Sequence, residues 1–271
     1  MVTERVQMTE NKEMPSEAFR LWIGGFFDIG GMMTFAPYIT KTDKAVYTYV
    51  HPILQVGDNN STHIKRFHEL VGLRGRVIPV KNSLIWRAEI NAAREIIDMM
   101  DEDYSPSRRS FFDALDLIDS AEEVEEKIAI MRLYQEEPRF QEQLDERPYA
   151  RQVTNLDFMA GAIDNRCIEG IRKTKWGPRP DLLILTKNYH LLLALSRHLG
   201  VAEPRILAPI GKVKDIDGSP FVQKESTAVL QLRHTAILRD YLLQIQPHLR
   251  LRGEEIAVLL DEEDLWSSHA R

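Results

Sequence analysis

The sequence predicts an α+β protein made of two pseudo-symmetric αββαββα repeats that pack through one helix each. The first observation is an internal similarity: residues 23–28 and 159–164 each run through an apolar residue, two small residues, two apolar residues and an aspartate. The second is that helices and hairpins follow one another in the same order in both halves. This agreement favours a tandem repeat over two unrelated buried helices.

Two small residues interrupt each of the paired apolar helices: Gly24 and Gly25 in the first, Ala160 and Gly161 in the second. Glycine inside a helix costs about 0.5–1 kcal/mol relative to alanine. Close approach of another backbone is the usual compensation. The sequence therefore predicts a helix–helix interface between the repeats at these four positions.

In the first half, aromatic and β-branched strands alternate with helices whose apolar residues recur at helical spacing. The segment 60–72 is typical of a capped helix, because it opens with Asn-Ser and ends in Gly. The predicted elements are a helix at 19–31, strands at 32–38 and 47–56, a helix at 60–72, strands at 76–80 and 83–90, and a helix at 92–100.

The second half repeats this order, with a longer loop rich in Gly, Asp and Pro between its last two strands. The predicted elements are a helix at 157–167, strands at 167–173 and 181–186, a helix at 186–200, strands at 201–207 and 228–233, and a helix at 235–246.

A strongly acidic segment joins the two halves. Within it, Ser120 followed by glutamates and spaced apolar residues predicts a capped helix, and Pro138 would bend or break that helix. We interpret its charged side as solvated, with a protein-docking surface as the alternative. The predicted divisions are an N-terminal tail (1–18), a first repeat (19–118), an acidic helical linker (119–150), a second repeat (151–262) and a C-terminal tail (263–271).

Composition narrows the class of protein. A chain of 271 residues with 44% hydrophobic content can bury one large core or two joined cores. One cysteine, Cys167, excludes an internal disulfide framework. The polar, acidic N-terminus is unlike a secretory or transit signal, and no apolar run approaches the ~18 residues that a membrane span needs. We expect a cytoplasmic monomer without membrane contact.

The net charge of −6 disfavours a nucleic-acid partner at first sight, but the charge is unevenly distributed. Residues 19–94 hold 10 Lys and Arg against 5 Asp and Glu, and residues 151–250 hold 15 against 9. Residues 95–150 hold 6 against 17. Basic charge therefore lies in the repeats, where a duplex backbone could meet it.

The basic residues of the predicted hairpins form the candidate nucleic-acid-binding set. On a β-ribbon they could contact phosphates or base edges in the major groove; the alternative is an ordinary solvated sheet face. Aromatic residues lie among them, and we interpret these as core, with nucleic-acid contact as the alternative: Tyr47, Tyr49, Trp86 and Trp176. The basic set is Lys41, Lys44, Arg74, Arg76, Lys81, Arg87, Arg172, Lys173, Lys175, Arg179, Lys212, Lys214, Lys224 and Arg233.

Several segments together resemble one known family, the two-repeat, single-chain LAGLIDADG homing endonucleases. The similarity covers most of residues 19–118 and 155–262, and it implies a saddle of antiparallel sheets that binds double-stranded DNA. The matching segments are the nine-residue motifs IGGFFDIGG (23–31) and MAGAIDNRC (159–167), the second strand HPILQV (51–56), the closing helix IQPHLRLRGEEIAVLLDE (245–262), and a weaker copy of that helix, SPSRRSFFDALDLI (105–118).

The resemblance also implies where cleavage chemistry would lie. Members of the family use the last acidic residue of each motif to hold divalent cations at the scissile phosphates. Those positions are Gly30 and Arg166 here, and neither residue can ligate a metal. Asp28 and Asp164 occupy an earlier motif position, about 200° away around the helix. The sequence therefore predicts that this mechanism is lost, with no catalytic residue, metal or cofactor.

Three functions follow from these observations. The first is a cleavage-inactive protein that binds double-stranded DNA or structured intron RNA, in a regulatory or maturase-like role. The second is a Mg²⁺-dependent, site-specific DNA endonuclease with a displaced metal site that uses Asp28, Asp164 or Glu169. The third is a protein-interaction scaffold that docks a partner on the acidic linker.

Overall fold

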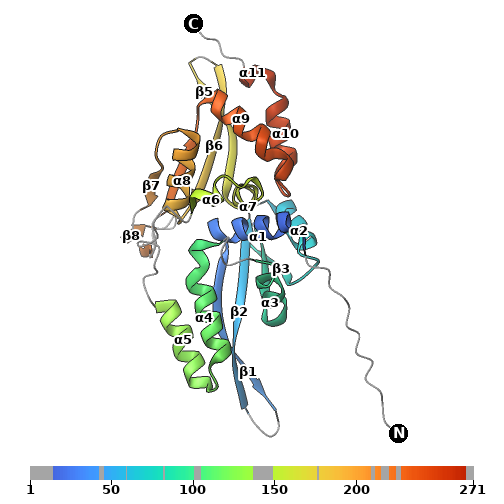
Figure 1. Cartoon of the computed structure of the whole chain (residues 1–271), viewed down its shortest axis with the longest axis vertical. Helices are drawn as coiled ribbons and strands as arrows, with labels where there is room; N and C mark the ends of the chain where they lie inside the picture. The colour runs from blue at the N-terminus through green and yellow to red at the C-terminus, as the bar shows by residue number, and fades with distance from the viewer. Residues whose placement is uncertain are drawn as a thin grey trace, which may run out of the picture.

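The structure, a computed structural model, consists of two sheet-and-helix halves on either side of two crossing helices, α1 (Glu17–Ile29) and α7 (Leu156–Arg166) (Figure 1). The sheets extend from this crossing in opposite directions along the long axis. The structure describes residues 15–42, 46–58, 60–81, 83–100, 105–136, 149–175, 177–208, 211–214, 220–223 and 227–266.

The first half contains one four-stranded antiparallel sheet in the order β1-β2-β4-β3, with helices on one side. After α1 its elements are β1 (Met32–Lys41), β2 (Val46–Asp58), α2 (Ser61–Leu70), β3 (Arg76–Val80), β4 (Ser83–Glu89), α3 (Ile90–Ile97), the short 3₁₀ helix η2 (Pro106–Arg108) and α4 (Arg109–Ser120).

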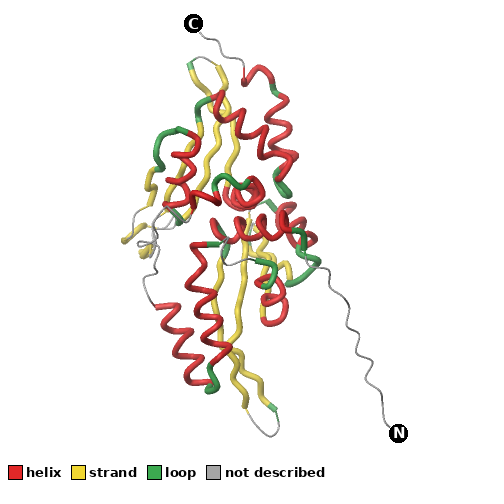
Figure 2. Tube along the Cα trace, viewed as in Figure 1, coloured by secondary structure: helices red, strands yellow, loops and turns green. Residues whose placement is uncertain are grey.

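The second half repeats this topology in a sheet with the order β5-β6-β10-β7. Its elements are α6 (Tyr149–Gln152), α7, β5 (Cys167–Thr174), β6 (Gly177–Thr186), α8 (Tyr189–Leu199), β7 (Arg205–Ala208), β8 (Gly211–Lys214), β9 (Pro220–Gln223), β10 (Thr227–Leu232), α9 (Thr235–Ile245), the 3₁₀ helix η4 (Gln246–His248), α10 (Gly253–Asp261) and α11 (Glu263–Trp266). The predicted α+β double repeat is confirmed (Figure 2).

Side-chain alternation gives each sheet one face toward the helices and one open face. In the first sheet, Met33, Phe35 and Trp86 are buried on the helix side. In the second, Leu182 and Leu230 are buried in the same way. The register therefore places the strand residues between them on the open faces, among them the candidate arginines Arg76, Arg87, Arg172 and Arg179.

The acidic segment between the halves forms α5 (Val124–Glu136), which packs along the edge strand β1. The Tyr134 hydroxyl donates to the Met33 carbonyl at 2.9 Å, and the Gln135 amide donates to the Phe35 carbonyl at 2.8 Å. Phe35 also stacks on Phe111 of α4, with ring centroids 4.7 Å apart. The helix thus protects a sheet edge and leaves Glu125 and Glu126 exposed to solvent.

The crossing of α1 and α7 is a direct backbone contact. A methyl group at Gly25 would overlap the carbonyl oxygen of Phe158, and one at Gly161 would overlap the carbonyl oxygen of Trp22. Phe158 and Trp22 each lie three positions before the glycine of their own helix, so the two contacts are reciprocal. Ala160 is fully buried beside them. Gly24 is also buried, and its carbonyl accepts a hydrogen bond from Ser105 Oγ.

Side-chain hydrogen bonds across the two halves reinforce this backbone contact. Asn165 Nδ2 donates to the Phe26 carbonyl at 2.6 Å. Thr186 Oγ1 donates to the carbonyl of Ile29, the last residue of α1, at 2.8 Å. Buried polar groups of this kind need partners, so these bonds fix the relative position of the two repeats.

Some predicted boundaries were wrong. Ser120 is the last residue of α4 rather than the start of the next helix, and its hydroxyl donates to the Leu117 carbonyl. The strand predicted from residue 201 begins at Arg205. The loop predicted before β10 contains the β8–β9 hairpin. Pro138 lies outside the described residues, and no described helix is long and apolar enough to cross a membrane.

Replacing Gly161 with alanine should destabilise the protein strongly, because the new methyl group would meet a backbone carbonyl that cannot move without separating the helices. Overpacking typically costs about 1–3 kcal/mol, and we expect the upper end of that range. Urea unfolding of Gly161→Ala and Gly25→Ala measures the change.

Gly170→Ala is the matched control, since a methyl group at this strand position meets no atom within 4 Å. Near-wild-type stability in all three variants would show that the helices do not touch at these glycines.

Candidate nucleic-acid interface

Gly30 and Arg166, the two positions where the family resemblance places acids, lie against each other where α1 and α7 end. A methyl group at Gly30 would lie 2.8 Å from both Cγ and Nε of Arg166. The Arg166 side chain therefore covers the Gly30 backbone, while part of it stays exposed. Gly31, with φ +79°, then turns the chain out of the helix in a left-handed conformation.

A second guanidinium group reaches the same place. Arg108 of η2 donates from Nε to the Phe27 carbonyl at 2.7 Å and from one terminal nitrogen to the carbonyls of Gly30 and Gly31 at 3.3 and 3.2 Å. It satisfies carbonyls that the end of α1 leaves without helical partners. Desolvation lowers the pKa of Arg166, the charge of Asp58 raises it, and the charge of Arg108 lowers it further. Two guanidinium groups, Arg108 and Arg166, thus make the end of the helix pair cationic, with the Asp58 carboxylate nearby.

Asp28, on α1, is buried and holds the segment that closes the first repeat. Its Oδ1 accepts from the Ser107 backbone N–H at 3.0 Å and from the Ser107 hydroxyl at 2.7 Å. Its Oδ2 accepts from Asn188 Nδ2 of the other repeat at 3.1 Å. Burial raises the pKa of Asp28 to about 6, although these hydrogen bonds and Arg108 act in the opposite direction.

Asp164, on α7, is also buried and holds the segment that closes the second repeat. It accepts from the backbone N–H groups of Arg250 and Arg252 at 2.7 and 2.8 Å, and from Trp22 Nε1 at 2.8 Å. Burial raises its pKa as well. Asp28 and Asp164 thus bind the segments that close their own repeats, and each also contacts the other repeat.

Acidic side chains near the helix pair belong to a charged cluster that joins the two halves. His63 of α2 lies between two carboxylates, with Nδ1 3.2 Å from Asp58 and Nε2 2.7 Å from Glu255 of α10. Arg252 bridges Asp58 and Glu169 at 3.4 Å each. Burial alone would lower the pKa of His63, yet its bonds to Asp58 and Glu255 raise it.

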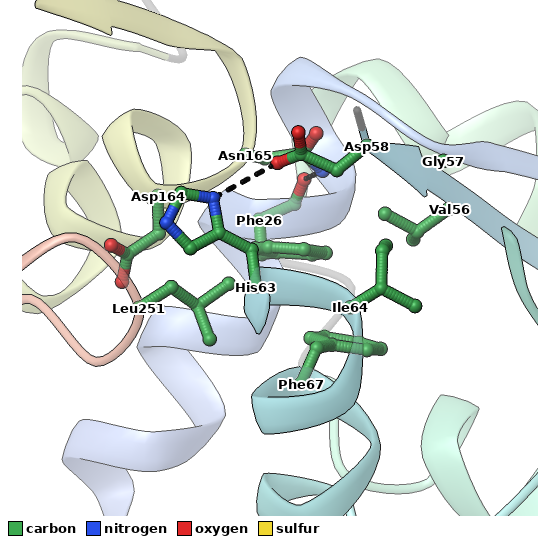
Figure 3. Close-up of a pocket in the computed structure, with 10 residues that line it drawn as sticks. All are labelled: Phe26, Val56, Gly57, Asp58, His63, Ile64, Phe67, Asp164, Asn165 and Leu251. Carbon is green, nitrogen blue, oxygen red and sulfur yellow. Dashed lines mark hydrogen bonds and ion pairs between the residues drawn. The ribbon is translucent and has the colours of Figure 1, made fainter. Parts of the chain in front are cut away.

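The cluster borders a small cavity of about 10 Å³, close to the space of a single water. Figure 3 shows His63, Asp58, Asp164 and Asn165 around it, with Phe26 and Phe67 among the apolar residues of the wall. Arg252 takes the bridging position between the carboxylates. Within the described residues, no group of three or more His, Cys, Asp or Glu side chains could hold a metal ion.

On the first sheet, two of the candidate arginines face each other. Arg76 and Arg87 are directly opposite in the β3–β4 register, and Glu89 contacts them at 3.3 and 2.6 Å. Arg74 instead binds Glu95 and the Val71 carbonyl. Lys41 is exposed at the end of β1 and Lys81 at the β3–β4 turn, where its φ is +49°.

On the second sheet, Arg172 and Arg179 are directly opposite in the β5–β6 register. Asp181, next on the same face, accepts from Gln231 Nε2 at 2.7 Å and lies 3.8 Å from Arg233. Lys173 points to the opposite face of β5, as alternation requires, and Lys175 lies in the following turn.

Other predicted positions can be placed only in part. The backbone of β8 carries Lys212 and Lys214. Lys44, Trp176 and Lys224 lie outside the described residues.

Three polar residues of the second sheet, Arg205, Gln231 and Asp181, were not among the predicted nucleic-acid-binding residues. Arg205 of β7 donates to Gln231 at 3.4 Å, and Gln231 donates to Asp181. These residues share the open face of the sheet with the arginine pair. Their spacing in the sequence is too large for a motif, and only alternation along each strand marks them as outward-facing.

Solved structures with the same arrangement of elements are found despite very low sequence identity. The LAGLIDADG homing endonuclease I-GzeII in complex with its DNA target matches with a TM-score of 0.54, at 8% identity, over 90% of this chain and 88% of that chain. The chain has the fold of the LAGLIDADG homing endonucleases.

Two further structures give the same result. I-LtrWI bound to target DNA matches with a TM-score of 0.52 at 10% identity, over 92% and 91% of the two chains. I-SmaMI bound to cleaved DNA matches with a TM-score of 0.51 at 13% identity, over 92% of each chain. No protein-family model matches the sequence, and no curated protein is similar to it.

Replacing Asp28 with asparagine should remove part of the pH dependence of stability. The folded pKa of Asp28, about 6, lies above the ordinary value of 3.8. The stability that the protonated carboxyl contributes is therefore fully present below about pH 4 and is lost as the pH rises through 6. The full change is about 3 kcal/mol, and about 1 kcal/mol of it falls between pH 5 and 7.

Urea unfolding at pH 5, 6 and 7 tests this. The difference in free energy of unfolding between the wild type and Asp28→Asn should decrease as the pH rises. A constant difference would mean that Asp28 titrates alike in the folded and unfolded chains.

Proposed function

We propose that this protein binds nucleic acid, double-stranded DNA foremost, across the open faces of its two sheets, and does not cleave it. The observation that carries the proposal is the pair of facing arginines in each sheet, Arg76 with Arg87 and Arg172 with Arg179. Two guanidinium groups side by side on an open sheet face can both contact the phosphates of one nucleic-acid backbone.

The two halves offer these pairs in one chain, so a monomer supplies both sheets to one duplex. The fold supports the same arrangement, since the similar structures I-GzeII and I-LtrWI are complexes with target DNA. Structured RNA is the second nucleic acid that such a surface could bind, in the maturase-like role expected from the sequence.

The absence of cleavage is proposed from the residues at the helix ends. Metal-assisted hydrolysis needs carboxylates or other oxygen ligands at the cations, and the resemblance puts Gly30 and Arg166 at those positions. Arg166 and Arg108 would repel a divalent cation and attract a phosphate instead. We infer that the cationic end of the helix pair binds a backbone phosphate without metal.

The geometry gives little support to the alternative function, a nuclease with a displaced metal site. Asp28 and Asp164 are buried and use their oxygens to accept hydrogen bonds from the chain. Glu169 is bound to Arg252. None of the three offers a free carboxylate toward the open faces.

The double variant Arg172→Ala/Arg179→Ala should bind a random-sequence DNA duplex more weakly than the wild type. Removing one arginine–phosphate interaction should reduce the slope of log K against log[salt] by about 0.9, so a reduction of about 2 is expected for the two arginines together. Fluorescence anisotropy between 50 and 200 mM NaCl measures both the affinity and the slope.

Lys65→Ala is the control, because this exposed lysine lies on α2, which packs on the helix side of the first sheet. An unchanged slope in the double variant would exclude the second sheet as the binding surface.

Wild-type protein incubated with Mg²⁺ should leave its own selected DNA target intact. Recovering that target from crosslinked cellular nucleic acid and running it on a denaturing gel after incubation tests this. Mg²⁺-dependent nicking that disappears in Asp28→Asn or Asp164→Asn would instead establish the nuclease alternative.

A further inference from the structure

The β1–β2 hairpin is longer than the sheet to which it belongs. β4 pairs with β2 only from residue 53 to residue 58, whereas β1 pairs with β2 along its whole length. Residues 46–52 and their partners on β1 therefore form a two-stranded ribbon that projects to the lower end of the molecule in Figure 1.

Three tyrosines lie on the open face of this ribbon. Tyr38 and Tyr49 are directly opposite in the register, and Tyr47 follows two positions from Tyr49 on the same strand face. Their side chains are 48%, 55% and 47% exposed. The rings of Tyr47 and Tyr49 are nearly parallel, with an interplanar angle of 19° and centroids 6.4 Å apart. We call these three residues the tyrosine face.

These rings are not part of the core that the hairpin uses. The core lies on the other side of the ribbon, where Val50 is buried and α5 packs against both strands. His51 lies beneath Tyr38 on the open side, with ring centroids 5.9 Å apart and planes at 80°. Clustered exposed rings are uncommon on a monomer and mark interaction surfaces.

The surroundings of the tyrosine face favour an anionic partner. Lys41 is exposed at the end of β1, where it pairs with Val46 beside Tyr47. Further along the same sheet face lie Arg76 and Arg87, with Arg87 opposite Gln55, six positions from Tyr49 on β2. Among the described residues of this face Glu89 alone is acidic, so a nucleic acid that reaches from the arginines to the tyrosine face meets mainly positive charge.

We propose that the tyrosine face binds unpaired bases of single-stranded nucleic acid by stacking. The rings of a paired duplex are covered by their neighbours, and its grooves offer polar edges that are read by hydrogen bonds. Parallel tyrosine rings offer flat apolar surfaces instead, which suit splayed-out bases, while the arginines further along the same face contact the phosphates of the adjoining duplex. This inference rests on the proposed nucleic-acid binding and adds a preference for single-stranded segments beside the duplex.

The test compares a 12-residue oligouridylate and a 12-residue oligothymidylate with a 12-base-pair duplex, using fluorescence anisotropy on the full chain. The triple variant Tyr38→Ala/Tyr47→Ala/Tyr49→Ala should bind the single strands at least tenfold more weakly, since each stacked base contributes substantially to affinity. Its affinity for the duplex should fall by a smaller factor than its affinity for the single strands, because the arginines that contact the duplex backbone are unchanged. The triple phenylalanine variant keeps the rings and should bind single strands within about threefold of the wild type.

Leu117→Ala, which removes an exposed apolar side chain of α4, is the control for a general loss of surface hydrophobicity. Crosslinking to an oligonucleotide that carries 5-iodouridine should label the peptide with Tyr47 and Tyr49. A larger loss for the RNA than for the DNA oligonucleotide would identify RNA as the preferred single strand, and equal losses would identify stacking common to both.

Unchanged single-strand binding in the alanine variant would overturn this inference, while the duplex result in the same assay would still report on the proposed function. Absence of binding to all three probes would overturn both. A concentration-dependent dimer of the wild type that the alanine variant lacks, measured by sedimentation together with unchanged single-strand binding, would show that the tyrosine face binds a second copy instead.

Discussion

Backbone contact between α1 and α7 is the constraint on which the rest of the structure depends. Because Gly25 and Gly161 each admit the other helix's carbonyl, the two helices run close enough for their ends to share one small volume. Gly30, Arg166 and Arg108 meet there, and the buried aspartates reach the opposite repeat from the same helices. A wider crossing would separate these groups and would place the sheets differently relative to each other.

Burying two carboxylates beside this contact is costly, and the structure offsets the cost with hydrogen bonds. Asp28 and Asp164 accept from backbone N–H groups of segments that approach their helix from the end of each repeat. Such donors favour the ionised form, whereas burial opposes it. The same aspartates therefore join three parts of the chain: the helix pair, the closing segment of their own repeat and the neighbouring repeat.

The sequence predicted the double repeat because its strongest signals are local. Small residues within apolar helices, caps such as Asn60 and alternating strands all depend on neighbours within a few positions. Contacts made over long sequence separations could not be predicted in this way: Arg252 with Asp58, Arg108 with the end of α1, and α5 with the edge of β1.

Composition also does not show which face of β2 turns toward the core. Tyr47 and Tyr49 were therefore predicted to be core residues, and the structure shows that they are exposed. The β8–β9 hairpin was missed because its Gly, Asp and Pro residues are typical of loops. The basic residues remain a predicted binding set, and the structure adds which of them face each other across a strand pair.

The reciprocal geometry of the helix contact also bears on how such a chain could arise. Each repeat presents a glycine and a carbonyl that fit a copy of the same pair, which is the arrangement found at a two-fold homodimer interface. One repeat could therefore pair with a copy of itself through this contact. In a single chain, by contrast, the two halves can carry different residues: a glycine at position 30 in one half and an arginine at position 166 in the other complement each other, which two identical subunits could not achieve.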